Sequence, residues 1–287
     1  MTVFLRKMQL GSLRILGLAL MALALVGVAG AGGARAADRD RVEAFLEVTG
    51  FDVALDSIAL SATSAPNMLG LEADDFGTQW MFLAESVFDT ELMRKRATDI
   101  LEATLEDDLL AHAAGFYATD LGQRLVVAEN EAHLADDDAK YAEGAELLAV
   151  LEENDDPRID LFRRMGHAID PNDIGMQAMT EIQVRFILAA SYAGVISLRV
   201  DEDGLRAALA ENADEVAKEV EVSSLQNAAY TYKDFTFEEL KTYTEALEEP
   251  DMMTVYELMN AVHFEVMSNR FEALALRLGQ MQPEQEL

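Results

Sequence analysis

The sequence predicts an all-α fold, a helical bundle built from two related helical halves. Five prolines interrupt 287 residues, and apolar residues recur three and four positions apart rather than in the alternation typical of strands. Alanine, leucine and glutamate, which favour helix, fill the segments between these breaks. These observations indicate helix almost throughout the chain that follows residue 36.

The first 36 residues have the order of an export signal. Arg6, Lys7 and Arg14 form a basic start, an apolar run covers residues 15–29, and Ala34-Arg35-Ala36 supplies a cleavage site. We therefore expect a periplasmic or secreted protein whose signal peptide is cleaved after Ala36, with no stable membrane insertion afterwards. The alternative is a retained anchor, since the apolar run approaches the roughly 18–20 residues that span a bilayer.

Composition narrows the classes of function. The chain contains no cysteine, which excludes disulfides, lipoprotein acylation and thiolate metal sites. Its net charge is −31, and the four basic residues of the signal account for part of the positive charge. Removing these four from the total of 22 leaves 18 basic residues against 53 acidic ones, a net charge of −35. Such a field repels phosphate backbones, so we expect no nucleic-acid partner.

Residues 37–155 are the predicted first helical repeat. Apolar spacing predicts helices from Arg41 to Gly50 and from Phe51 to Ala62, followed by a turn at Ala65-Pro66-Asn67. An apolar stripe predicts the next helix at Phe76, Trp80, Leu83 and Val87. Three threonines are expected to cap the helices that follow: Thr90, Thr104 (in a capping box with Asp107) and Thr119.

Residues 156–287 are the predicted second helical repeat, after an acidic stretch that ends at Asp155-Asp156-Pro157. A helix starts after Pro157, and Asp170-Pro171 reads as the cap and first position of a buried central helix. The remaining expected features are one charged amphipathic helix over residues 201–222, a full capping box at Thr236 and Glu239, and a last long helix opened by Pro250.

Two segments align at an offset of 131, which suggests an internal duplication. Asp107-Asp108-Leu109 corresponds to Glu238-Glu239-Leu240, and Thr119-Asp120 corresponds to Pro250-Asp251. In both segments a short capped helix ends and a longer helix begins. Near the start of each half, Arg41 matches Arg158 at an offset of 117.

The segment 108–125 carries a family resemblance. It has an acidic helix start, then Phe116-Tyr117, Thr119, and Gly122-Gln123. In this pattern the chain resembles the exported bacterial proteins of the domain of unknown function 2059 family, and the duplication would make two divergent copies. The resemblance implies an α-helical envelope protein and brings no catalytic residues with it. Phe116 and Tyr117 are expected to pack at a helix junction, and Gly122 to admit a close helix neighbour.

No catalytic, cofactor-binding or metal-binding residue is predicted. The four histidines lack metal-binding spacing. Glu129 and His133 are four residues apart and are interpreted as an ordinary surface pair, whereas His263, among apolar residues, is interpreted as a hydrogen-bonded core histidine. We therefore expect a non-enzymatic binding or scaffolding role in the cell envelope rather than an enzymatic one. The expected partner is an envelope protein, a peptide or a lipid in a groove between the halves. The alternative is a hydrolase with an unrecognised carboxylate site.

Overall fold

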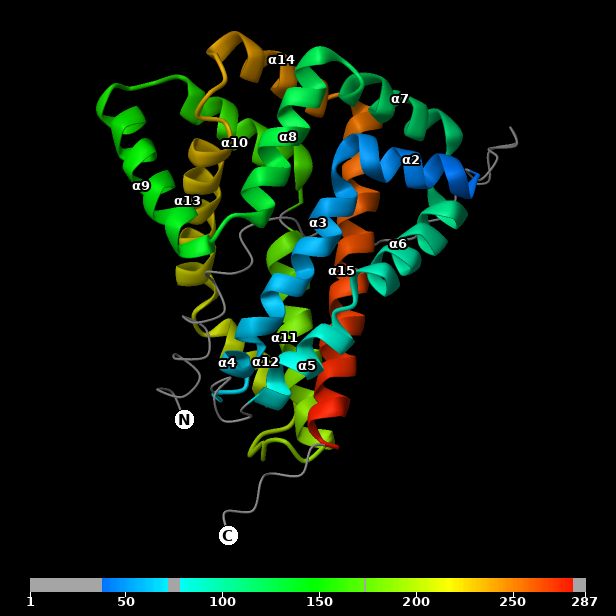
Figure 1. The fold of residues 1–287 in the computed structure, drawn as a ribbon. Coiled ribbons are helices and arrows are strands. Elements are labelled where there is room, and N and C mark those ends of the chain that lie inside the picture. The colour runs from blue at the N-terminus through cyan, green and yellow to red at the C-terminus, as the bar shows by residue number, and fades with distance from the viewer. Residues whose placement is uncertain (1–37, 72–77, 173, 281–287) are drawn as a thin grey trace.

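The computed structural model describes residues 38–71, 78–172 and 174–280, and this part of the chain is all-α, with no strand (Figure 1). The segment expected to be an export signal and Phe76 lie outside the described residues. The elements are, in order, α2 (Arg39–Thr49), α3 (Phe51–Ser57), η1 (Ile58–Ser64), α4 (Ala65–Met68), α5 (Thr78–Val87), α6 (Thr90–Thr104), α7 (Asp107–Tyr117), α8 (Asp120–Leu134), α9 (Asp137–Glu153), α10 (Arg158–Ile169), α11 (Ile174–Tyr192), α12 (Glu202–Ala210), α13 (Ala213–Thr231), α14 (Phe237–Leu247) and α15 (Pro250–Leu278).

The first helices agree with the apolar spacing, with one correction. Gly50 ends α2 with φ of +74°, a left-handed conformation that a residue without Cβ adopts easily. The chain then continues through α3 into a 3-10 turn. The predicted turn at Ala65-Pro66-Asn67 is wrong, because these residues begin the short helix α4. Proline is compatible with the first turn of a helix, where its missing N–H has no partner to lose.

The capping predictions are confirmed at two positions and wrong at two others. Thr119 accepts from Gly122 N at 3.1 Å and starts α8. Thr236 forms the full capping box of α14 with Glu239. In contrast, α6 is capped by Asp89 rather than Thr90. Thr104 is the last residue of α6 and donates its hydroxyl hydrogen to Ile100 O instead of capping α7. A threonine inside the helix end can satisfy its hydroxyl locally, so spacing alone misplaces the cap.

Two boundaries in the second half differ from the sequence prediction. The central helix α11 begins at Ile174, although Asp170 still caps it by accepting from Ile174 N and Gly175 N at 2.9 and 2.8 Å. Residues 201–222 do not form one helix, because α12 ends at Ala210 and α13 begins at Ala213. Asp201 caps α12 by accepting from Gly204 N, as the acidic cluster at this position suggests.

The long helix α15 organises the core. It packs along α11 and also contacts α5, α6 and α7, and Figure 1 shows it running through the molecule. Its buried side chains include Val255, Val262, Val266 and Phe271. Phe271 contacts both Phe88 and Phe186 with ring centroids 5.4 and 5.2 Å apart, which joins the N-terminal part of the bundle to α11.

Helices α9 and α13 lie side by side at one edge of the bundle (Figure 1). This pairing crosses the predicted boundary at residue 155, since α9 precedes it and α13 follows it. Gly144 is buried in α9, and a Cβ atom at this position would overlap the backbone carbonyl of Gln226 in α13. The two helix backbones therefore approach closely where only glycine fits. Gly122 similarly lies against the backbone of Phe116 and Tyr117.

Within the described ranges, no helix is both long and apolar enough to cross a membrane. The apolar segment of α11 that includes Phe186, Ile187 and Ala190 is instead buried in the core.

We predict that Gly144→Ala destabilises the protein by about 2 kcal/mol, because the new methyl group forces α9 and α13 apart. The matched control is Gly115→Ala in α7, where a Cβ atom meets nothing within 4 Å. That substitution should stabilise the protein by about 0.5–1 kcal/mol through helix propensity. Urea denaturation of both variants checks the pair, and equal effects would contradict the close packing of α9 against α13.

Candidate functional site

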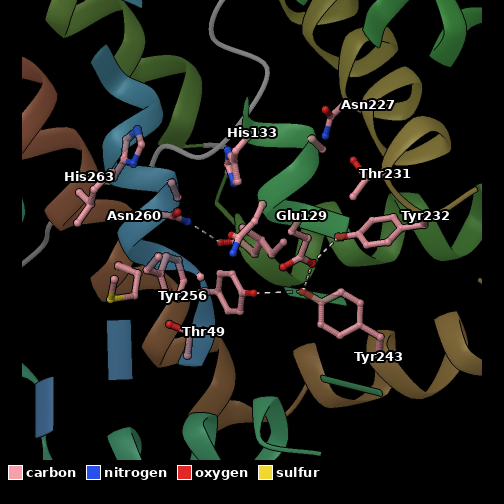
Figure 2. Close-up of a pocket in the computed structure, with 18 residues that line it drawn as sticks. Thr49, Glu129, His133, Asn227, Thr231, Tyr232, Tyr243, Tyr256, Asn260 and His263 are labelled. Carbon is pink, nitrogen blue, oxygen red and sulfur yellow. Dashed lines mark hydrogen bonds between the residues drawn. The ribbon is translucent and has the colours of Figure 1, made fainter. Parts of the chain in front are cut away.

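A pocket of about 100 Å³ lies where α3, α8, α13 and α15 converge (Figure 2). Its floor and walls come from segments far apart in the sequence, including the ends of α2 and α10. The lining residues are Thr49, Gly50, Phe51, Ala54, Leu55, Glu129, Asn130, Ala132, His133, Ile169, Asn227, Thr231, Tyr232, Tyr243, Tyr256, Met259, Asn260 and His263. The pocket therefore combines apolar walls with a small set of polar groups, as ligand sites do.

Glu129 of α8 is the only carboxylate among the described residues that line this pocket. The hydroxyls of Tyr232 and Tyr243 both donate to its Oε1 atom at 2.8 Å. The Tyr243 oxygen lies 3.2 Å from the Tyr256 hydroxyl and 3.1 Å from that of Tyr117, which also contacts Tyr256. Because Tyr243 donates its hydrogen to Glu129, its oxygen can only accept from these neighbours. The carboxylate thus orders a cluster of four tyrosine hydroxyls.

Burial dominates the electrostatics of this cluster. Desolvation raises the pKa of Glu129 from 4.5 to about 7, although the hydrogen bonds from Tyr232 and Tyr243 act in the opposite direction. Desolvation and the nearby Glu129 charge also raise the pKa of Tyr232 and Tyr243 well above 10. The tyrosines are therefore neutral donors, while Glu129 changes its charge near neutral pH.

Two histidines line the same pocket; the sequence interpretation of His133 is wrong, and that of His263 is right about its burial. His133 does not belong to a surface pair, since burial, with a smaller effect of Lys140, lowers its pKa to about 4. His263 is buried as expected, but it makes no hydrogen bond within the described part of the chain. Burial, with a smaller effect of His133, lowers the pKa of His263 to about 4 as well. Both imidazoles are neutral at pH 7, so neither balances the charge of Glu129.

Several buried polar atoms of the pocket have no partner in the described protein. They are Asn130 Oδ1, Asn227 Oδ1 and Thr231 Oγ1. The residues Asn227 and Thr231 are only 7% and 8% exposed. Leaving such groups unpaired away from bulk water costs on the order of 1–3 kcal/mol each. Polar groups that converge on a cavity and lack protein partners are typical of a site that a ligand or ordered water completes.

Other histidines and acids lie away from this pocket. The Nε2 atom of His112 lies 3.2 Å from a carboxylate oxygen of Glu249 at the protein surface. Among the residues that the structure describes, no three of the His, Cys, Asp and Glu side chains are grouped to hold a metal ion. The pocket itself was not predicted from the sequence, because each lining residue looks ordinary within its own helix.

Residues 91–149 match a bacterial family. The family is described as an uncharacterized protein conserved in bacteria (DUF2059). The match confirms the resemblance seen in the segment 108–125, and it covers α7, α8 and most of α6 and α9. It includes Glu129 and His133, so part of the pocket lies within the family segment. Comparisons with curated proteins and with solved structures find no match to this chain.

We predict that Glu129→Gln stabilises the protein at pH 8 and changes its stability little at pH 4. Between pH 4.5 and about 7 the unfolded chain has released a proton that folded Glu129 still holds. The contribution of Glu129 to the free energy of unfolding therefore falls as the pH rises through that window, by on the order of 3 kcal/mol in total. Denaturation curves from pH 4 to 8 measure the difference. Glu131→Gln, an exposed neighbour on α8, is the control and should leave the profile unchanged; a similar profile for both variants contradicts the desolvation of Glu129.

Proposed function

We propose that this chain is an exported, non-enzymatic binding protein of the cell envelope that holds a small ligand in the pocket around Glu129. The observation that carries this proposal is that three residues with unpartnered buried oxygens, Asn130, Asn227 and Thr231, all line one pocket. A purely structural core would bury apolar groups at these positions, because unpaired polar groups destabilise the folded state.

The proposal includes two related halves with the pocket between them. Helices α7 and α14 begin at residues 107 and 237, and α8 and α15 begin at residues 120 and 250. Both pairs are separated by 130 positions, one fewer than the offset of 131 used for the sequence alignment. At 130, the buried residue Leu110 of α7 corresponds to the buried residue Leu240 of α14.

The same offset relates three pairs of residues that line the pocket. Glu129, Asn130 and His133 of α8 correspond to Met259, Asn260 and His263 of α15. The asparagines also occupy similar places. Asn260 donates to the carbonyl of Ile169, the last residue of α10, at 3.2 Å. Asn130 lies against Gly50, directly after the last residue of α2. These matches support a duplicated unit that supplies an Asn-x-x-His face to the pocket from each half.

The enzymatic alternative requires a different arrangement. A hydrolase with two carboxylates needs a general acid and a general base in one site, and this pocket is lined by one carboxylate. Glu129 alone retains a pKa of about 7, which suits general acid–base chemistry. Native mass spectrometry separates the two functions: a binding protein releases its ligand unchanged over time, whereas an enzyme converts it.

We predict that Thr231→Val stabilises the ligand-free protein by about 1 kcal/mol, since it removes an unpaired buried hydroxyl at constant shape. The same variant should retain less ligand than the unmodified protein when both are purified from the native envelope and examined by native mass spectrometry.

The matched control is Thr244→Val. Thr244 is fully buried outside the pocket and donates to Leu240 O at 2.8 Å. The Thr244→Val variant should be less stable by about 1 kcal/mol, because it loses this hydrogen bond, and should keep its ligand. Absence of any copurified ligand from the unmodified protein would overturn the proposed function.

Export gives a separate prediction. The protein recovered from the native envelope should begin at Ala37, because a signal peptidase cuts after Ala34-Arg35-Ala36. Intact-mass measurement checks this directly. Ala36→Phe, which places a large residue at the cleavage position, should leave the precursor uncut. A mature protein that still contains residues 1–36 contradicts cleavage and favours the retained anchor.

A further inference from the structure

We propose that the pocket around Glu129 recognises a small organic cation with one ammonium group and a short apolar tail. This inference rests on the proposed binding function and specifies the class of ligand. It is argued from the charge balance of the pocket, its unpaired atoms, its aromatic residues and the difference between its two halves.

The charge balance of the lining favours a positive ligand. Within the part of the chain that the structure describes, Glu129 is the one carboxylate of the lining, and no lysine or arginine accompanies it. The titratable groups around Glu129 are the four hydroxyls of the tyrosine cluster and two histidines. They belong to Tyr117 of α7, Tyr232 after α13, Tyr243 of α14, Tyr256 of α15, His133 of α8 and His263 of α15. Helices α3 and α10 present only uncharged residues to the pocket. Lys140, the one lysine or arginine that is buried among the residues that the structure describes, contacts Asp137 at 2.7 Å and donates to Ala132 O at 3.2 Å.

The unpaired atoms also favour a hydrogen-bond donor. The carbonyl oxygens of Asn130 and Asn227, two lining residues, have no hydrogen-bond partner within the described protein, and Glu129 Oε2 accepts no hydrogen bond there either. An ammonium group supplies three N–H donors and no acceptor, so it complements such a set. A carboxylate ligand would instead add acceptors and a second negative charge beside Glu129.

Aromatic side chains surround the same carboxylate. Phe51, Tyr232, Tyr243 and Tyr256 line the pocket, and Phe51 and Tyr256 contact each other with centroids 5.6 Å apart. Aromatic residues next to a carboxylate form a favourable environment for alkylammonium groups, through cation–π attraction and a desolvated ion pair. The net charge of −31 further concentrates cations at the protein surface.

The two halves differ at one lining position, and this difference indicates where each end of the ligand would lie. Glu129 and Met259 occupy corresponding positions 130 residues apart, and both line the pocket. One half therefore offers a carboxylate where the other offers a flexible apolar side chain. With Ala54 and Leu55 also in the lining, the Met259 side suits a short hydrocarbon tail. The cavity volume of about 100 Å³ limits this tail to a few carbon atoms.

Ligand binding is then linked to the ionisation of Glu129. Because desolvation raises the pKa of this carboxyl group to about 7, the empty site is mostly neutral at pH 5.5 and mostly charged at pH 8. A cation binds the ionised form, so its affinity rises with pH through neutrality. A neutral alcohol of the same shape has no such dependence.

Three probes of one carbon skeleton test the inference: n-propylammonium, 1-propanol and propionate. The Met259 methyl group reports binding in ¹³C-methyl-methionine NMR spectra of the full chain in 0.15 M salt, with its signal assigned by Met259→Leu. We expect propylammonium to bind at least about tenfold more tightly at pH 8 than at pH 5.5. Propanol should bind with little pH dependence, and propionate should cause no shift.

Glu129→Gln should raise the dissociation constant of propylammonium at pH 8 to its value at pH 5.5 and abolish the pH dependence. The variant is expected to be the more stable protein at pH 8, so loss of folding does not explain such a result. The exposed control Glu131→Gln should bind as the unmodified protein does. Tighter binding of propanol or propionate than propylammonium overturns the cation class but leaves the pocket as a binding site. No shift with any probe also overturns the inference, whereas the copurified ligand decides the binding function separately.

Discussion

The Glu129 carboxylate is the group on which the centre of this molecule depends. Its Oε1 atom accepts hydrogen bonds from Tyr232 after α13 and Tyr243 of α14, and these connect to Tyr117 of α7 and Tyr256 of α15. One acceptor thus connects the ends of α7 and α13 and the helices α14 and α15 to α8. A buried network of this kind is strong only when every member is satisfied. The requirement explains why the tyrosines are buried to this degree and why their hydroxyls point at one another.

In the proposed binding function, this arrangement lowers the stability of the fold and gives a prepared site. Desolvation disfavours the charged form of Glu129, and the unpaired oxygens of Asn130, Asn227 and Thr231 add further unfavourable terms. The fold tolerates these terms because α15 and α11 bury a large apolar surface around Phe271 and Phe186. The rigid core therefore carries the free energy of folding, and the pocket retains polar groups that a ligand can satisfy without reorganising the helices.

Local chemistry made much of the fold predictable, whereas the site depends on contacts between distant segments. Gly50, Thr119 and Thr236 act within four residues of themselves, so their spacing indicates helix ends directly. Thr90 and Thr104 show the limit of such signals, because Asp89 and the carbonyl of Ile100 offer competing partners. Glu129 and His133 look like a solvated pair on one helix. The packing of α3 and α13 against α8, with α15 lining the same pocket, shields them from water. A repeated Asn-x-x-His at 130–133 and 260–263 was the available signal, and an alignment shifted by one residue conceals it.

The proposed duplication and the single charge of the pocket are best understood together. A site formed by two copies of one unit would at first carry the same residue at both corresponding positions, and two carboxylates in such a small cavity would repel each other strongly. Retaining Glu129 on α8 with Met259 on α15 removes that repulsion. The asparagines and histidines, which are neutral here, can remain paired without this penalty. Physical chemistry therefore permits the polar, uncharged residues to stay alike in both halves and requires the charged position to differ. In the proposed two-copy frame, that difference gives the pocket one polar end and one apolar end.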